Sequence, residues 1–197
     1  MKTMITLATL IGLATVPSAA LAQRVPAASI VVVETDRIYR ECTACRTAQT
    51  QLQTRVTALQ TRQQTLTNEL RPEGQAIQAA IQALNGKEPD AALRTRAQAF
   101  QTRQEQANQE LSRGQQNIQS IQANVVQQIN ARMNPVISQV MTARGANLAV
   151  DVGSTLAHAP VINVTAEVLA GLNRALPSVS LTPLPTQPQQ QQQPQGR

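Results

Sequence analysis

Cys42 and Cys45 are the residues whose type and spacing most directly imply chemistry in this sequence. Their Cys-x-x-Cys spacing at a helix start brings the two side chains within disulfide range, and an oxidising compartment favours such a bond. We therefore predict a local disulfide. A thioredoxin-like redox site uses the same spacing, but it requires a surrounding βαβ domain, which the helical periodicity described below argues against.

The remaining residues give little support for catalysis. His158 is the only histidine, and no paired carboxylate, serine or cysteine accompanies it at a recognisable spacing. A zinc site needs more ligands than two cysteines and one histidine supply. No glycine-rich phosphate loop occurs in the sequence. The sequence thus predicts no catalytic residues, no metal site, no cofactor and no enzymatic activity.

Basic side chains in the middle of the chain form a third candidate group, suited to binding. Most of them flank the apolar positions of two predicted helices, and we expect Glu69 to be the acid that balances them in the first helix. Guanidinium groups without carboxylate partners can bind acidic protein segments or anionic lipid head groups. The alternative is a solvated helix face, or pairing with acids such as Glu105 and Glu110. The candidate binding residues are Arg55, Arg62, Lys87, Arg94, Arg96 and Arg103.

The elements that position these residues follow from a heptad-like apolar pattern. Apolar residues recur at spacings of three, four and seven, which places them on one face of each of two long helices. The pattern comprises Leu52, Val56, Leu59, Leu66, Leu70, Ile77 and Leu84, and then Leu93, Ala97, Phe100, Ala107, Leu111, Ile118, Ile121, Val125, Ile129, Met133, Val136 and Val140. It predicts an antiparallel helical hairpin over residues 46–143.

A polar turn at residues 85–90 separates the two helices, because Asn-Gly and Pro-Asp pairs interrupt helices. At 1.5 Å per residue, helices over 46–84 and 91–143 extend about 58 Å and about 80 Å, so they project from the rest of the molecule. We expect Asp90 to cap the second helix and Gly145 to end it.

Three residues interrupt the regular pattern inside these helices. Pro72 and Pro135 predict bends rather than breaks, because the apolar register continues on both sides of each proline. Gly114 falls within the second apolar stripe and is expected to be a weak point of the seam.

Residues 23–45 and 144–176 predict a small β-containing body built from both ends of the chain. The predicted elements are strands at 30–33, 147–152, 155–159 and 161–164, and a short amphipathic helix capped by Thr165. A body of this size usually needs extra support, and we expect oligomerisation to supply it. The predicted fold class is mainly α, with a long antiparallel coiled-coil hairpin inserted in a small β body.

The two ends of the chain have distinct compositions. Residues 1–22 combine a positive start, an apolar stretch too short to span a bilayer and an Ala-Leu-Ala cleavage site, the pattern of a secretory signal peptide. The mature chain is therefore expected outside the cytoplasm, in a bacterial periplasm. Residues 177–197 are rich in proline and glutamine and nearly uncharged, which predicts a disordered tail.

Overall composition narrows the function classes. The chain is 42% hydrophobic but only 1% aromatic, so a large globular core is unfavourable and narrow seams between helices are favoured. The formal net charge is +6. Because the basic residues are not clustered and the chain is exported, a nucleic-acid partner is not expected.

The order of these parts resembles that of the OmpH/Skp family of periplasmic chaperones. The resemblance covers roughly Ile30–Leu176 and includes the strand Ile30–Val33, the turn Asp36–Tyr39 and the glutamine-rich hairpin. Its most specific part is the closing stretch NLAVDVGSTLAHAP-VINVTAEVLAGLN, in which Leu148–Asp151 looks like the family's strand and Val164–Leu169 like the start of its terminal helix.

This resemblance implies a jellyfish-like homotrimer whose strands form a shared body and whose three hairpins enclose a cavity. In that family the cavity holds unfolded outer-membrane proteins without ATP. Two features depart from the family pattern: Lys87 is the only lysine of the mature chain, and the Pro/Gln-rich tail is additional. The alternative is a structural or adaptor coiled-coil protein of the cell envelope.

Overall fold

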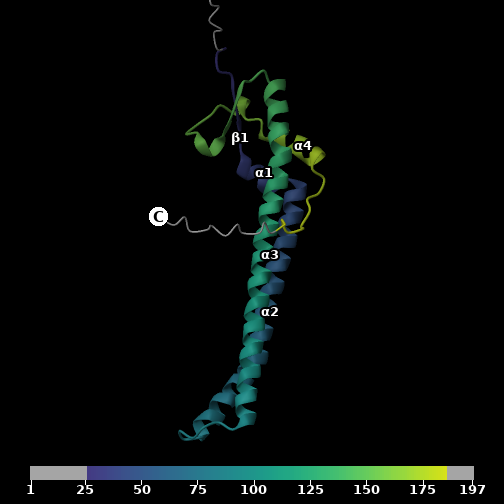
Figure 1. Cartoon of the computed structure of the whole chain (residues 1–197). Helices are drawn as coiled ribbons and strands as arrows, with labels where there is room; N and C mark the ends of the chain where they lie inside the picture. The colour runs from purple at the N-terminus through teal and green to yellow at the C-terminus, as the bar shows by residue number, and fades with distance from the viewer. Residues whose placement is uncertain (1–25, 186–197) are drawn as a thin grey trace, which may run out of the picture.

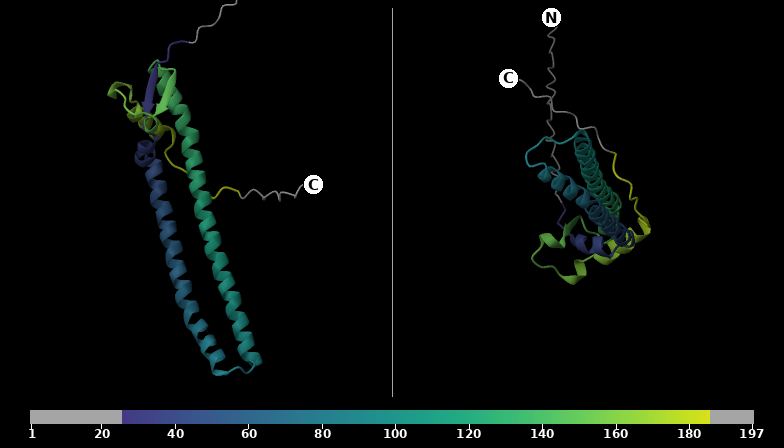
Figure 2. Two further views of the ribbon diagram at one scale, coloured as in Figure 1. Left: turned by 90° about the vertical axis from the view of Figure 1, so that its left-hand side faces the viewer. Right: turned by 90° about the horizontal axis from the view of Figure 1, so that it is seen from below.

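A computed structural model describes residues 26–185, which form a long helical hairpin attached to a small body (Figures 1 and 2). The predicted signal peptide lies outside the described residues. In chain order the elements are β1 (Ile30–Val33), α1 (Thr35–Glu41), α2 (Thr43–Ala83), α3 (Ala91–Ala143), β2 (Leu148–Asp151), two 3-10 turns (Val152–Ser154 and Pro160–Ile162) and α4 (Thr165–Ala175).

Helices α2 and α3 lie side by side and run in opposite directions, as the heptad pattern predicts (Figure 2). They contain 41 and 53 residues, which corresponds to about 62 Å and about 80 Å. Every apolar position of the predicted seam is buried or half-buried, so the assignment of the helix faces is confirmed. Among residues 26–185, no helix combines the length and the apolar character that crossing a bilayer requires.

The three expected irregularities leave both helices continuous. Pro72 and Pro135 lie within uninterrupted α2 and α3. Gly114 lies directly against Leu59, because a Cβ at Gly114 would lie only 2.6 Å from Cδ1 of Leu59. The absence of a side chain at Gly114 is what allows Leu59 to pack between the helices.

The ends of the hairpin helices follow local chemistry. Asp90 Oδ1 accepts a hydrogen bond of 2.8 Å from the Leu93 N–H, which is the predicted cap of α3. The connecting turn uses positive φ at Asn85 and Gly86, and Gly145 adopts φ of 66° directly after α3. The predicted start and end of the second helix are therefore confirmed.

The body contains two parallel strands. β1 pairs with β2 from Ile30 opposite Leu148 to Val33 opposite Asp151. The predicted strand at 155–159 is wrong, because this segment is a loop between two 3-10 turns. The predicted strand at 161–164 reduces to a single bridge between Asn163 and Val32, since Pro160 begins a 3-10 turn there.

Polar side chains connect the body elements. Asp151, at the end of β2, accepts hydrogen bonds from the backbone N–H (3.2 Å) and the hydroxyl of Thr35, the first residue of α1. Thr165 does not cap α4 as expected; its hydroxyl instead accepts a 2.8 Å hydrogen bond from the Glu34 N–H. Asn163 Oδ1 bonds the Thr165 N–H at 3.0 Å. The closing motif identified in the sequence thus has a structural role.

The core lies where the base of α3 meets α1, α4 and the sheet. Its most buried side chains include Ile38, Ile121, Val164, Val168 and Leu172. They form one cluster with the disulfide-linked cysteines and with apolar residues of the C-terminal half of α3. The hairpin and the body therefore share a core, and α3 belongs to both.

The chain after α4 differs from the expectation of disorder. Residues 177–185 are described and extend along α3, seen as the yellow segment in Figures 1 and 2. Val179 and Leu181 pack against the core, and backbone groups of this segment bond to α3 side chains. These contacts with α3 are long-range, so composition alone did not reveal them. The rest of the predicted tail, residues 186–197, lies outside the described residues.

Replacing Ile121 by alanine should destabilise the fold strongly. Ile121 is 1% exposed, and removing a buried isoleucine side chain costs about 2–5 kcal/mol. The matched control is Ile81→Ala in α2, because Ile81 is 48% exposed; its expected cost is below about 1 kcal/mol. Urea unfolding followed by circular dichroism at one protein concentration measures both. Equal losses would contradict the placement of the core.

Candidate functional site

Arg62, one of the predicted binding residues, pairs with an acid on the other hairpin helix. Its Nε and Nη2 donate to the two carboxylate oxygens of Glu110 at 2.7 and 3.1 Å. Both side chains are exposed. The hydrogen bonds from Arg62 lower the pKa of Glu110 from its ordinary value. Glu110 thus neutralises Arg62 and joins α2 to α3.

Arg96 and Arg103 share a second acid, Glu73 of α2. Arg96 donates to both Glu73 oxygens at 2.8 and 3.1 Å, and Nη2 of Arg103 lies 3.8 Å from Oε1. The hydrogen bond from Arg96 is the main reason that the pKa of Glu73 is lowered. The expectation that Glu69 balances the first helix is wrong, because Glu69 forms no ion pair among residues 26–185. The alternative of pairing with Glu110 is confirmed for Arg62, and Glu73 is the acid that the sequence analysis missed.

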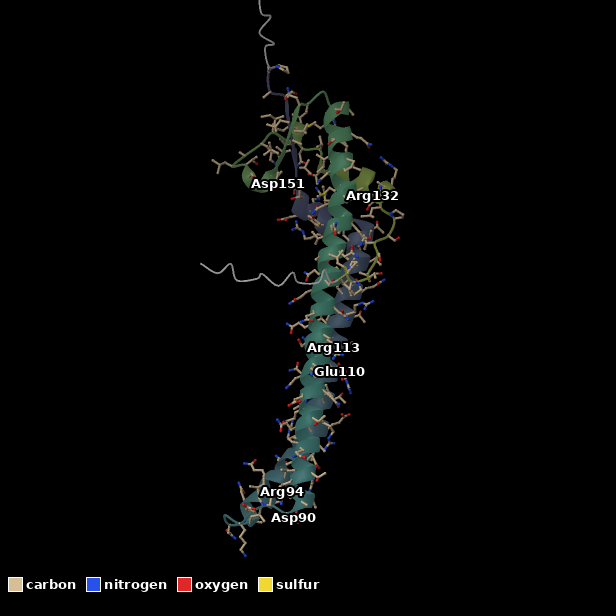
Figure 3. The ribbon with its side chains drawn as sticks, viewed as in Figure 1. Asp90, Arg94, Glu110, Arg113, Arg132 and Asp151 are labelled. Atoms are coloured by element: carbon tan, nitrogen blue, oxygen red, sulfur yellow. A yellow bond between two sulfur atoms is a disulfide. The ribbon has the colours of Figure 1, made fainter. Side chains whose placement is uncertain are left out.

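Arg55, Lys87 and Arg94 have a different environment. All three are exposed, and within residues 26–185 none has a carboxylate within 4.0 Å. Arg55 lies on α2, Lys87 in the connecting turn and Arg94 in the first turn of α3. Figure 3 shows Arg94 beside Asp90 at the far tip of the hairpin. The six predicted residues are therefore not gathered into one site but spread along the hairpin.

A shallow groove on α2 was missed by the sequence analysis. It has a volume of about 1050 Å³, and its lining residues are Arg40, Arg46, Gln49, Thr50, Gln53, Thr54, Thr57, Ala58, Thr61, Arg62 and Thr65. Its threonines, Thr50, Thr54, Thr57, Thr61 and Thr65, are called the threonine face below. They recur at spacings of three and four. That spacing was the available signal.

The threonine face lies opposite the hairpin seam. Thr54 is two positions from Leu52, and Thr57 is two positions from Leu59. Two positions correspond to about 200° around an α-helix, so these threonines point away from the seam. Thr50, Thr54 and Thr65 donate their hydroxyl protons to the carbonyl four residues earlier at 3.0 Å.

Because these three hydroxyl protons are used within the helix, Thr50, Thr54 and Thr65 offer their methyl groups and not free donors. From residue 43 to residue 68 the sequence contains three arginines and no acid. The surface is therefore weakly apolar and positively charged.

A second groove, of about 390 Å³, lies between α2 and α3 near the body. Apolar side chains contribute to its lining, including Leu52, Val56, Ile118 and Val126. Val126 is 42% exposed. The hairpin thus offers two neighbouring surfaces with apolar character, and neither is a deep enclosed cavity.

Cys42 and Cys45 form a disulfide at the junction of α1 and α2, with their Cα atoms 5.1 Å apart. Cys42 is fully buried and Cys45 nearly so. Thiol–disulfide exchange requires a thiolate to reach a sulfur atom, and the burial of both cysteines leaves little surface for such an attack. The bond fixes the bend between the two helices.

His158 lies in the loop between the two 3-10 turns, not in a strand as expected. Its Nδ1 is 3.3 Å from the carbonyl oxygen of the adjacent Ala159. Within the described part of the chain, no cluster of three or more His, Cys, Asp or Glu side chains could hold a metal ion. The candidate site is therefore the hairpin surface.

Comparison with known proteins identifies the family. The model of the OmpH-like outer membrane protein family matches residues 29–172, and the chain belongs to this family. No curated protein matches the chain. A crystal structure of a candidate OmpH-like outer membrane chaperone from Caulobacter crescentus CB15 is similar, with a TM-score of 0.67 and 15% identity. The match covers 83% of this chain and 96% of that chain. At this identity, the similarity shows a shared fold.

Replacing Glu73 by glutamine should lower the melting temperature at pH 7 but not in acid. The folded-state pKa of Glu73 is lowered by Arg96, so its stabilising effect is present above its unfolded pKa of about 4.5 and is lost as the pH falls through the folded value. The melting-temperature difference between wild type and Glu73→Gln should be a few degrees at most, and should disappear once the pH is low enough to protonate Glu73 in the folded state. Circular dichroism at several pH values measures it.

Glu69→Gln is the matched control for this experiment. Glu69 lies on the same helix and has no cation within 4.0 Å among residues 26–185. Its replacement should leave the melting temperature nearly unchanged at each pH. A pH-independent loss for Glu73→Gln would contradict an ionic contribution from Glu73.

Proposed function

We propose that this chain is an ATP-independent periplasmic holdase chaperone that binds unfolded outer-membrane proteins between the helical hairpins of a homotrimer. Membership of the OmpH-like family supports this proposal. The observation that carries it is the long projecting hairpin, whose outward surface on α2 is weakly apolar and positively charged. Such a surface favours many weak contacts over one tight site.

The chemistry of the client explains why weak contacts suffice. Strands of a membrane β-barrel alternate apolar and polar residues, so the unfolded chain exposes apolar side chains at regular intervals. Threonine methyl groups and arginine stems can shield these side chains without a deep pocket. Because each contact is weak, the client is released without a nucleotide or another cofactor.

The unpaired basic residues Arg55, Lys87 and Arg94 are proposed to contact acidic client segments. Arg55 lies far along α2 from Lys87 and Arg94 at the hairpin tip, and this separation suits an extended client better than a compact ligand. Weak contact with anionic lipid head groups is proposed on the same basis. Arg62, Arg96 and Arg103 contribute less charge, because two acids, Glu110 and Glu73, offset part of their positive charge.

The body supports the proposed trimer. A two-stranded parallel sheet is rarely left uncovered, yet in residues 26–185 the outer edge of β2 has no strand partner. Ile30 and Leu148, which pair across the two strands, are 41% and 45% exposed. Further copies of the chain would cover this edge and these side chains.

Export to the periplasm is proposed from residues 1–22, whose composition is that of a signal peptide. The disulfide between Cys42 and Cys45 supports an oxidising compartment.

The mature chain should be a trimer at micromolar concentration, measured by light scattering coupled to size exclusion. Leu148→Glu places a charge at the exposed end of β2 and should shift the protein toward monomer. Ile81→Glu, at an exposed position near the hairpin tip, is the control and should leave the trimer intact. A monomeric wild type under these conditions would contradict the proposed assembly.

The holdase activity can be tested by diluting a urea-unfolded outer-membrane β-barrel protein into buffer and following turbidity. The wild type should keep the client soluble in a complex of one client per trimer. The double variant Thr50→Glu and Thr54→Glu, which places charges on the threonine face, should weaken client binding on the order of tenfold, or about 1.4 kcal/mol.

Thr102→Glu is the matched control, because Thr102 on α3 is exposed and makes the same hydrogen bond to the carbonyl four residues earlier. It should behave as wild type. If the wild type fails to suppress aggregation, the holdase proposal is wrong and a structural or adaptor role in the envelope replaces it.

A further inference from the structure

Residues 177–185, called the C-terminal segment below, bind to α3 through main-chain hydrogen bonds. The Gln128 side chain accepts from the Ser180 N–H at 2.8 Å and donates to the Ser180 carbonyl at 2.9 Å. Asn124 Nδ2 donates to the Thr182 carbonyl at 2.7 Å, and the Ser120 hydroxyl to the Leu184 carbonyl at 3.3 Å. Side chains of α3 therefore bond to the backbone of every second residue of the C-terminal segment from Ser180 to Leu184.

The spacings of the two partners match. Ser120, Asn124 and Gln128, called the polar row below, are four residues apart, which is about 6 Å along an α-helix. Alternate residues of an extended chain are about 6.6 Å apart. One face of α3 thus presents donors at the repeat of an extended polypeptide. Because the partners are backbone groups, this recognition does not depend on which side chains the bound segment carries.

The side chains of the C-terminal segment alternate between two environments. Val179 and Leu181 are half-buried and pack against the core, whereas Ser180 and Thr182 are exposed. This alternation of apolar inward and polar outward residues is the pattern of a membrane β-barrel strand. Over residues 179–182 the segment therefore has the alternation expected of the proposed clients.

The occupied surface adjoins surfaces that remain open. Val125 and Val126, which follow Asn124 on α3, line the groove between α2 and α3. The segment is held by a few largely exposed hydrogen bonds and by half-buried side chains. Weak binding of this kind allows an external chain to compete for the same contacts.

We propose that the polar row of α3 is a binding site for extended polypeptide segments with alternating apolar and polar residues, which the chain's own C-terminal segment fills until a client displaces it. This inference rests on the proposed holdase function and names the form in which a client binds. Attachment in the same chain gives the C-terminal segment a high local concentration, so it lowers the apparent affinity for clients and prevents nonspecific association when no client is present.

The test uses a fluorescently labelled peptide with the sequence of residues 177–185, PSVSLTPLP, and the full chain. Leu181→Asp should release the C-terminal segment without altering the polar row. Anisotropy should then show at least tenfold tighter peptide binding to Leu181→Asp than to wild type. The scrambled peptide PSSTVLLPP, which lacks the alternation, should bind at least tenfold more weakly than PSVSLTPLP to this variant.

Adding Gln128→Ala to Leu181→Asp should reduce peptide binding about tenfold. The matched control is Gln116→Ala, because Gln116 is an exposed glutamine of α3. Equal peptide binding by wild type and Leu181→Asp, or no effect of Gln128→Ala, would overturn the inference.

A second measurement needs no variant. Hydrogen exchange of the wild type should show that the Ser180 amide loses protection when an unfolded outer-membrane protein is bound. Unchanged protection in a stable complex would overturn the inference while leaving the holdase proposal intact. Conversely, if the peptide results are as expected but the wild type fails to keep the client soluble, the site stands and the holdase proposal falls.

Discussion

The structure depends on one narrow apolar seam between two long helices. With a single Phe, a single Tyr and no Trp, the chain relies on aliphatic side chains and close approach of the backbones. Gly114 receives Leu59, and Gly74 receives the Phe100 ring, whose Cζ lies 2.9 Å from where a Cβ would be. Ion pairs at the rim of this seam add little stability because they are exposed. The seam fixes which faces of α2 and α3 remain free, and hence which surfaces can bind another chain.

The same constraint explains why the candidate binding surfaces are spread along the hairpin rather than concentrated in one site. A hairpin of only two helices has no room for an enclosed pocket, because seam side chains fill the space between the helices. Any binding by the hairpin must therefore use its outward faces. The threonine face supplies methyl groups and positive charge, while the polar row of α3 supplies donors at the repeat of an extended chain. The two faces differ in what they can contact: the threonine face can contact side chains of a bound polypeptide, and the polar row can hydrogen-bond its backbone.

Sequence reasoning succeeded where the determinants are local or periodic. The apolar spacing identified both helix faces, and Asp90 and Gly145 marked helix ends through their own side-chain and backbone chemistry. It failed where partners are distant in sequence. The pairing of Glu73 with Arg96 depends on the register between α2 and α3. The ordered conformation of residues 177–185 depends on hydrogen bonds from α3 side chains. The threonines of the threonine face recur at helical spacing in the sequence, but threonine is not classed as apolar. The hydrogen bonds from the hydroxyls to the carbonyl four residues earlier were needed to show that this face presents methyl groups.

Helix α3 has 53 residues against 41 in α2, and its extra length forms part of the body core. One helix is therefore a continuous shaft from base to tip, whereas the other begins at a disulfide-linked bend beside it. Movement of the arm is accordingly expected as tilting of the whole continuous helix α3 rather than as bending at a joint within it. Over a length of about 60 Å, a tilt of about 10° displaces the tip by about 10 Å. A small change of tilt at the base would thus become a large displacement of the hairpin tip.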